Sequence, residues 1–179
     1  TKTQKLPKTF DLTFENVSFA YPDSEEAVLE NIDFSVKQGE TIAVIGGTGS
    51  GKSTIAKLIP RFYDVSKGEI KLGGVDIRDL KQSELHDLIG YVPQKANLFS
   101  GNIRENINYG SSKNLSDEEI IEALKIAQAW DFVQKLPEDL NEKVSQGGKN
   151  FSGGQKQRLS IARAIASKAP ILIFDDSFS

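Results

Sequence analysis

The sequence contains no cysteine and no methionine, and only one histidine and one tryptophan. Without cysteine the chain has no disulfide framework and no thiol chemistry, which fits a reducing compartment. It also lacks a long apolar run, since the longest falls far short of the roughly 18 residues that span a bilayer. No secretory leader is visible over residues 1–11. These absences argue against a disulfide-stapled secreted domain and against a membrane span within this stretch.

Neither sign of charge dominates, because the sequence has 22 Lys and Arg and 25 Asp and Glu, which gives a net charge of −3. This balance argues against a nucleic-acid partner and against general binding to a membrane surface. With 38% hydrophobic and 26% charged residues in 179, the chain can bury a core and stay soluble. It starts at Thr1 without any methionine and stops at Ser179 just after a buried-looking strand, so we expect a fragment of a longer polypeptide.

The N-terminal third has the pattern of β-structure. Apolar and polar residues alternate over residues 10–15 and again over 32–36, a period typical of half-buried, antiparallel strands. Residues 41–45 instead form an uninterrupted apolar run, which predicts a central parallel strand buried on both faces. Shorter strands are predicted at 69–72, before a Gly-Gly turn, and at 89–92.

Helix is predicted from Ser53 until Pro60 and over most of residues 97–168. Two capping boxes mark helix starts in the longer stretch, with a serine followed three residues later by Glu or Gln. The boxes are Ser116 with Glu119 and Ser152 with Gln155; apolar residues follow at helical spacing, namely Ile120, Ile121, Leu124, Ala127 and Trp130, and then Leu159, Ala162, Ile165 and Ala166. After Pro170, residues 171–174 return to the buried-strand pattern.

A glycine-rich loop lies between the run at 41–45 and the helix predicted from Ser53. It satisfies the pattern G-x-x-x-x-G-K-[ST], whose backbone N–H groups bind phosphate. Its residues are Gly46, Gly47, Thr48, Gly49, Ser50, Gly51, Lys52, Ser53 and Thr54. Lys52 would place its ammonium against the β- and γ-phosphates of ATP, and Ser53 would give its hydroxyl to Mg²⁺. The alternative is an ordinary glycine-rich loop with an exposed lysine, but the complete pattern in this context favours the phosphate site.

Asp175 follows the predicted strand 171–174. A carboxylate at the end of a buried strand beside the phosphate-loop strand can hold Mg²⁺, directly or through water. Four apolar residues before an aspartate would otherwise indicate only a strand that runs into a turn. Together with the glycine-rich loop, Asp175 is predicted to be a metal ligand.

With Gly46–Ser53, Phe151–Gln155 and Ile171–Asp175 in place, the chain resembles the nucleotide-binding domains of ABC transporters. Segments 98–107 and 61–64 are most similar to the exporter branch. The resemblance implies an α/β fold, with the parallel core sheet of a P-loop NTPase (RecA-like), an N-terminal antiparallel β subdomain and an inserted helical subdomain. One domain over residues 1–179, incomplete at its C-terminus, would comprise 1–95 as β subdomain and P-loop core, 96–168 as helical subdomain and 169–179 as the Walker B strand.

The resemblance also implies roles for further residues. Tyr21 matches the aromatic residue that stacks on adenine, although a tyrosine at a strand end can simply pack on the core. Gln94 matches the loop glutamine that contacts Mg²⁺ and the attacking water. The signature motif, which binds ATP held by a second domain, corresponds to Ser152, Gly153, Gly154 and Gln155. A helix N-terminus with open glycines offers an anion site, but the same residues are explained by capping alone.

The sequence departs from the family pattern at three places. The usual catalytic base is a glutamate directly after the Walker B aspartate, and Asp176 stands there. Residues 145–148 replace a Glu-containing loop that couples to the membrane domain, and Phe151 replaces a leucine. An intact signature beside a weakened base is typical of the degenerate half of a heterodimeric exporter; a homodimer and an engineered Glu-to-Asp exchange are the alternatives. His86 is not the family's switch histidine, and we expect it to face solvent.

The sequence therefore predicts an ATP-binding, ATP-hydrolysing domain with Mg²⁺ as cofactor. Its expected partners are a second nucleotide-binding domain and a transmembrane domain, at the cytoplasmic side of the cell membrane. A soluble ABC-type ATPase serving translation or DNA maintenance is the alternative, disfavoured by the near-neutral charge and the absence of coiled-coil heptads. A nucleotide kinase would carry a substrate lid in place of Ser-Gly-Gly-Gln.

Overall fold

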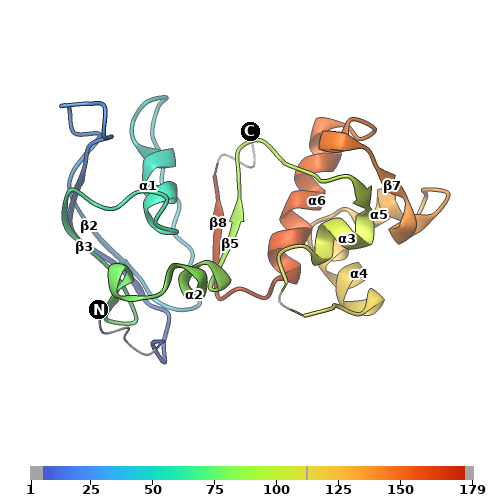
Figure 1. Ribbon diagram of the computed structural model, residues 1–179, viewed down its shortest axis with the longest axis horizontal. Helices are drawn as coiled ribbons and strands as arrows, with labels where there is room; N and C mark the ends of the chain where they lie inside the picture. Colours follow the sequence, from blue (N-terminus) through green and yellow to red (C-terminus); the bar gives the residue numbers. More distant parts are fainter. Residues whose placement is uncertain (1–5, 112, 176–179) are drawn as a thin grey trace. The chain divides into compact units, whose positions relative to one another are not determined.

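The computed structural model describes residues 6–111 and 113–175. The chain folds into two compact units, an N-terminal unit of Thr1–Ile89 and a C-terminal unit of Gly90–Ser179. Figure 1 shows strands and short helices in the N-terminal unit, and a group of helices together with paired strands in the C-terminal unit.

An antiparallel sheet dominates the N-terminal unit. Its strands lie in the order β2-β1-β3-β4, and they are β1 (Leu12–Phe19), β2 (Leu29–Val36), β3 (Lys67–Leu72) and β4 (Val75–Asp76). The alternation seen in the sequence places Phe14 in the core, where its side chain is 1% exposed. Phe14 pairs with Phe34 across the strands, with ring centroids 4.4 Å apart. The prediction of antiparallel strands in this third of the chain is confirmed.

The apolar run at residues 41–45 does not form the predicted strand. The structure assigns no strand there, and no strand among residues 6–89 pairs with it. Its side chains are exposed, Ile45 to 93% and Ile42 to 48%. An apolar run indicates that a segment is stable when buried, but a strand also needs neighbours that supply backbone hydrogen bonds. The prediction of a buried central strand is therefore wrong for this structure.

Short helices complete the N-terminal unit, namely α1 (Lys52–Leu58), the 3₁₀ turn η1 (Ile77–Asp79) and α2 (Gln82–Asp87). Helix α1 ends two residues before Pro60, close to the predicted limit. His86 is exposed, as expected. Its Nε2 lies 2.9 Å from the carbonyl oxygen of Pro60, so the imidazole fastens α2 to the end of α1.

The C-terminal unit contains the predicted helical stretch. Its main helices are α3 (Ile103–Asn108), α4 (Asp117–Ile126), α5 (Trp130–Val133) and α6 (Gly153–Ala166); shorter elements are β6 (Gly101–Asn102), β7 (Lys143–Val144), η2 (Asp139–Asn141) and η3 (Gln146–Gly148). Both capping boxes are formed, by Ser116 with Glu119 and by Ser152 with Gln155. The apolar spacing predicted to reach Trp130 is interrupted, because α4 ends at Ile126 and Gln128 takes a positive φ of 59°.

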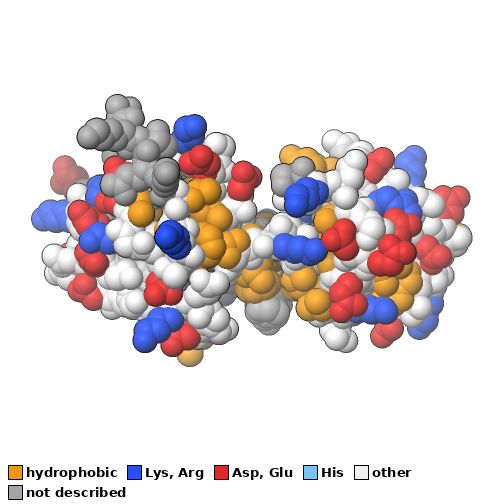
Figure 2. All heavy atoms as spheres, turned by 90° about the horizontal axis from the view of Figure 1, so that it is seen from below, with side chains coloured by type: hydrophobic (Ala, Val, Ile, Leu, Met, Phe, Trp, Pro, Cys, Tyr) orange, Lys and Arg blue, Asp and Glu red, His pale blue; other side chains and the backbone are white. Residues whose placement is uncertain are grey.

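A shared apolar core joins these helices. Buried side chains come from α3, α4 and α6, including Ile107, Leu124 and Leu159. Among the described residues, no helix is both long and apolar enough to cross a bilayer. On the face seen in Figure 2, acidic and basic side chains are interspersed and no area of one sign dominates.

Two strands pair within the C-terminal part of the chain, β5 (Ile89–Val92) and β8 (Ile171–Phe174). The backbone N–H of Asp175 donates to the carbonyl oxygen of Val92 at 2.9 Å. Because this bond joins the carboxyl ends of both strands, the strands run parallel, as their arrows do in Figure 1. Both strands form where they were predicted, but the expected burial of β8 is wrong, because Leu172 is 42% and Phe174 37% exposed.

Arg163 on α6 holds several segments of the C-terminal unit together. Its guanidinium donates to the carbonyl oxygens of Asn97 and Asn106, at 2.8 Å each, and to Asn106 Oδ1 at 3.0 Å. It also lies over the rings of Phe99 and Tyr109, 5.1 and 5.8 Å from their centroids. Burial lowers the pKa of Arg163, but an arginine stays protonated in proteins. Five donors in one planar group suit this many acceptors.

We expect Arg163→Leu to lower the free energy of unfolding by about 3 kcal/mol, because hydrogen bonds to charged groups contribute about 1.5–3 kcal/mol each and are not fully additive. Urea unfolding of the chain measures this change. Arg158→Leu on the same helix is the matched control, since the exposed Arg158 makes one long bond of 3.5 Å to the carbonyl oxygen of Gln128. It should change the free energy by less than about 0.5 kcal/mol. Equal losses in the two variants would contradict the role given to Arg163.

Candidate nucleotide-binding site

The glycine-rich loop turns sharply into helix α1. Gly51 is the residue before the helix and takes φ +91°, and Gly49 takes φ +79°. Both values lie where a side chain is disfavoured. A Cβ added at Gly51 would also lie 2.7 Å from Leu29 Cδ2, so the buried Leu29 side chain would have to shift to admit a larger residue. Backbone conformation and packing thus both favour glycine at this turn.

Open space borders the same loop. A Cβ added at Gly47 or at Gly49 would meet no atom within 4 Å. The N–H of Ser50 donates to the carbonyl oxygen of Gly47 at 3.1 Å, which closes the turn. The loop therefore combines a fixed backbone with room for a group that approaches its glycines, as a phosphate cradle requires.

Lys52 and Ser53 occupy the first two positions of α1 and are half-buried. The first turn contains no acidic residue, so no carboxylate within the helix offsets the partial positive charge of its N-terminus. The structure therefore puts the predicted ammonium and hydroxyl next to the loop. Their roles toward ATP and Mg²⁺ stay predictions.

Tyr21 contacts the helix that follows the loop. Its hydroxyl is hydrogen-bonded to the hydroxyl of Thr54 at 2.9 Å, and Thr54 is only 4% exposed. The ring of Tyr21 meets the rings of Phe19 and Tyr63 edge-on, with centroids 5.0 and 5.2 Å away. The packing alternative for Tyr21 therefore holds in part. Stacking on adenine stays a prediction, which the fixed position of this ring favours.

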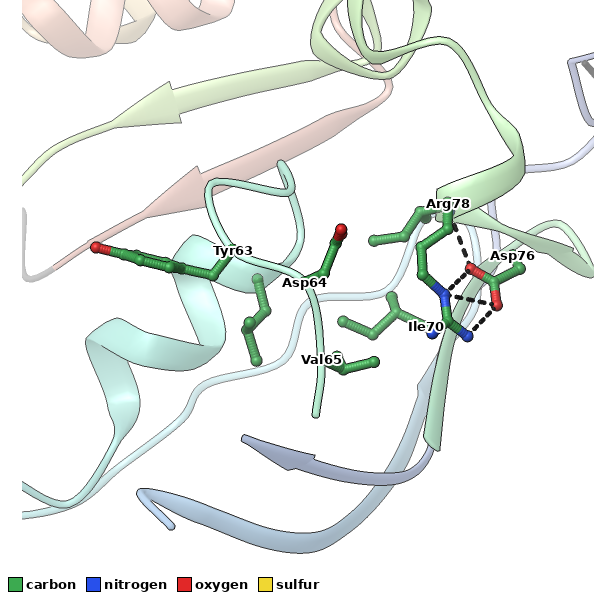
Figure 3. A pocket seen from close by; sticks show the side chains of 8 residues that line it. Tyr63, Asp64, Val65, Ile70, Asp76 and Arg78 are labelled. Atoms are coloured by element: carbon green, nitrogen blue, oxygen red, sulfur yellow. Dashed lines mark hydrogen bonds and ion pairs between the residues drawn. The ribbon is translucent and has the colours of Figure 1, made fainter. Parts of the chain in front are cut away.

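Two hollows are found among the described residues of the N-terminal unit. One has a volume of about 10 Å³ and lies beside the Asp76–Arg78 ion pair, whose oxygen and nitrogen are 2.7 Å apart (Figure 3). It has room for about one water molecule and for no larger ligand. The other, of about 280 Å³, is open to solvent and lies at the end of β1, with Phe19 and Ala20 in its lining. It is therefore adjacent in sequence to Tyr21.

In the C-terminal unit, Asp175 stands at the end of β8, as predicted. The hydroxyl of Tyr91 on β5 donates to Asp175 Oδ2 at 3.0 Å. Burial and then the Asp175 carboxylate raise the pKa of Tyr91 far above its usual value, so this phenol stays a donor at neutral pH. Sequence reasoning missed Tyr91. The available signal was a hydroxyl-bearing residue within an otherwise apolar strand.

Gln94 and Asp176 are the two other residues predicted to take part in catalysis. Gln94 is exposed in the loop after β5, directly after Pro93. Asp176 lies outside the described residues. The structure assigns no chemistry to either residue.

The signature residues form the start of α6. Ser152 Oγ accepts from the N–H of Gln155 at 3.2 Å, and Gln155 Oε1 accepts from the N–H of Ser152 at 3.0 Å. A Cβ added at Gly153 or Gly154 would meet no atom within 4 Å. The capping explanation is therefore correct, and the side chain of Gln155 is used in it. The open glycines leave a surface that a second molecule can approach closely, so the role in trans stays a prediction.

The loop before the signature is fixed by its own side chains. Asn150 Oδ1 accepts from the N–H and the hydroxyl of Ser145, at 3.1 and 2.9 Å, and Asn150 Nδ2 donates to the carbonyl oxygen of Lys143. Gly148 takes φ +68°, and a Cβ there would lie 2.8 Å from Leu98 Cδ1. A closed loop thus stands where the family carries its glutamate. The sequence analysis also did not identify Asn150.

The available donors fit Mg²⁺ bound together with a nucleotide. The described residues contain no group of three or more His, Cys, Asp or Glu side chains that could hold a metal by themselves. Mg²⁺ typically takes one or two protein oxygens and completes its shell with phosphate and water. The carboxylate of Asp175 and the hydroxyl of Ser53 are oxygen donors of that kind.

A glycine-rich loop leading into a helix and an aspartate at the end of a parallel strand are the two marks of a P-loop NTPase. The fold is that of an ABC ATPase, mixed α/β with an antiparallel β subdomain. The chain belongs to the ABC transporter family, whose model matches residues 29–179.

Individual relatives agree with this assignment. The chain is 48% identical over 168 residues to an ATP-dependent lipid A-core flippase of Haemophilus influenzae (strain 86-028NP), covering 94% of this chain and 29% of that protein. It is equally similar, with the same coverage, to the uncharacterized ABC transporter ATP-binding protein YfiB of Bacillus subtilis. Among solved structures, a bacterial Atm1-family ABC exporter with ATP bound matches with a TM-score of 0.91 and 38% identity, covering 99% of this chain and 31% of that one. The chain thus spans under a third of these relatives.

Proposed function

We propose that this chain is the ATP-binding domain of an ABC exporter and couples the binding and hydrolysis of ATP to transport across a membrane. The glycine-rich loop carries the proposal, because its backbone is fixed by Gly51 while the space beside Gly47 and Gly49 stays open. The similarity to an ABC exporter with ATP bound, over 99% of the chain, supports it.

Each site residue has a part in binding. Loop N–H groups and the start of α1 bind the phosphates, and Lys52 adds an ammonium at the β- and γ-phosphates. The Tyr21 ring stacks on adenine. Ser53, Asp175 and Gln94 hold Mg²⁺, which when bound neutralises charge on the β- and γ-phosphates. Gln94 also orients the attacking water.

A second nucleotide-binding domain completes the site. The signature residues Ser152–Gln155 of one domain bind the ATP held by the loop of the other, since open glycines at a helix start accept an anion closely. Two ATP molecules are then enclosed between two domains. The transmembrane domain of the same transporter is the third partner, which puts this domain at the cytoplasmic side of the cell membrane.

Asp176 weakens catalysis in this domain. An aspartate carboxylate sits about 1.5 Å further back than that of glutamate, the length of one carbon–carbon bond. A base must come within about 2.6–3.2 Å of the proton that it takes. We propose that this domain is the degenerate half of a heterodimeric exporter, which binds ATP, turns it over slowly and completes the partner's site.

Calorimetric titration of Mg-ATP into the purified chain tests the central claim. We expect saturable binding with Kd below about 1 mM, equivalent to at least 4.1 kcal/mol. Folded protein that binds no Mg-ATP at millimolar concentration would exclude the proposal. The link to transport has a separate test, since the parent gene should encode several transmembrane helices upstream of Thr1.

A further inference from the structure

Tyr91 makes a contact with Asp175 that the proposed mechanism does not use. It lies on β5, half-buried, and its hydroxyl donates to Asp175 Oδ2 at 3.0 Å. The same aspartate is held through its backbone, since its N–H donates to the carbonyl oxygen of Val92. Asp175 is thus bonded to β5 at two points, one in the main chain and one in the side chain.

This arrangement restrains the carboxylate. An aspartate side chain has two rotatable bonds, and a hydrogen bond to one oxygen fixes the direction of the other. The bond from the phenol to Oδ2 therefore fixes the orientation of the whole carboxylate group. A phenylalanine at position 91 would keep the ring of Tyr91 and remove the hydroxyl that makes this bond.

We propose that Tyr91 is a positioning residue for the Mg²⁺ site, which holds the Asp175 carboxylate in a fixed orientation for binding the metal. This inference rests on the proposed function, because it takes Asp175 as a ligand of Mg²⁺ bound with ATP. Groups that hydrogen-bond to metal-binding carboxylates contribute strongly to metal binding, and their loss typically costs 10–100-fold in affinity or activity.

The alternative for Tyr91 is a structural role, in which the hydroxyl only ties β5 to β8. The two roles differ in their dependence on the metal. A structural bond affects the chain whether or not Mg²⁺ is present, whereas a positioning bond matters only when the metal is bound. Comparing nucleotide binding with and without Mg²⁺ therefore separates them, since the ratio of the two affinities measures the coupling between metal and nucleotide.

The experiment measures the Kd of a non-hydrolysable ATP analogue by calorimetry, once with excess Mg²⁺ and once with EDTA. We expect Tyr91→Phe to weaken binding about tenfold in Mg²⁺ and to leave the Kd in EDTA unchanged. Tyr109→Phe is the matched control, because Tyr109 is 67% exposed in the same unit; it should equal the wild type in both conditions. Equal Kd values for Tyr91→Phe and wild type in Mg²⁺ would overturn the inference, as would an equal loss in Mg²⁺ and EDTA.

Asp175→Asn distinguishes failure of this inference from failure of the proposed function. We expect it to weaken binding in Mg²⁺ at least as much as Tyr91→Phe does. If Asp175→Asn loses the Mg²⁺ effect and Tyr91→Phe keeps it, Tyr91 has no positioning role and the proposed function stands. If Tyr91→Phe weakens binding in Mg²⁺ while Asp175→Asn does not, Tyr91 acts by another route and the inference is wrong. A wild-type chain that binds no analogue in either condition overturns both.

Discussion

Replacing Lys52 by alanine will weaken the binding of Mg-ATP by about 100-fold, which corresponds to about 2.7 kcal/mol. Lys52 stands in the first turn of α1, directly after Gly51. Its ammonium is the proposed partner of the β- and γ-phosphates, and truncating one member of a close charge pair typically costs about 2–5 kcal/mol. Alanine is at least as favourable in a helix as lysine, so the loop and α1 should keep their structure. Titration calorimetry measures the change.

Lys57→Ala is the control for this prediction. Lys57 lies in the last turn of the same helix, about 7.5 Å along the axis from Lys52 at 1.5 Å per residue. The exchange removes the same charge from the chain, so it corrects for any long-range effect of net charge. Its Kd should match that of the wild type. If Lys52→Ala also binds Mg-ATP with wild-type affinity, the glycine-rich loop does not have the proposed role.

Local sequence signals predicted the local structure well. The alternating residues of β1 and β2 and the capping boxes at Ser116 and Ser152 each involve residues close in the chain, and the structure contains all of them. A capping box needs only two residues three positions apart. The strand predicted at residues 41–45 has no such local basis. A strand buried on both faces depends on neighbours elsewhere in the sequence, which hydrophobicity alone does not specify.

The same distinction applies to the candidate site. The loop at Gly46–Thr54 is contiguous, so its pattern could be recognised directly. The contact between Tyr91 and Asp175 joins residues 84 positions apart, and that between Arg163 and Asn97 joins residues 66 apart. Each follows from pairing or packing that brings distant segments together, and neither leaves a spacing in the sequence. Residues that orient a site are therefore harder to predict than the residues that form it.

Asp176→Glu should raise ATP turnover by up to about 100-fold in the full-length transporter with its partner domain. The exchange adds one methylene and moves the carboxylate forward by about 1.5 Å. A displacement of about 1 Å in a catalytic group can cost on the order of 10²-fold in rate, so restoring the reach of the base should recover a factor of that size. Steady-state phosphate release, measured at saturating Mg-ATP, gives the turnover number.

Asp176→Asn provides the comparison that isolates the base. Asparagine has the length of aspartate and no basic carboxylate, so it should lower turnover further. The affinity for Mg-ATP should stay close to that of the wild type in both variants, because the phosphates are bound by the loop and Lys52. A rise in turnover with Asp176→Glu at unchanged affinity would assign the slow step to proton transfer at this position. Unchanged turnover would mean that aspartate is an adequate base here, and the proposal of a degenerate half would then be wrong.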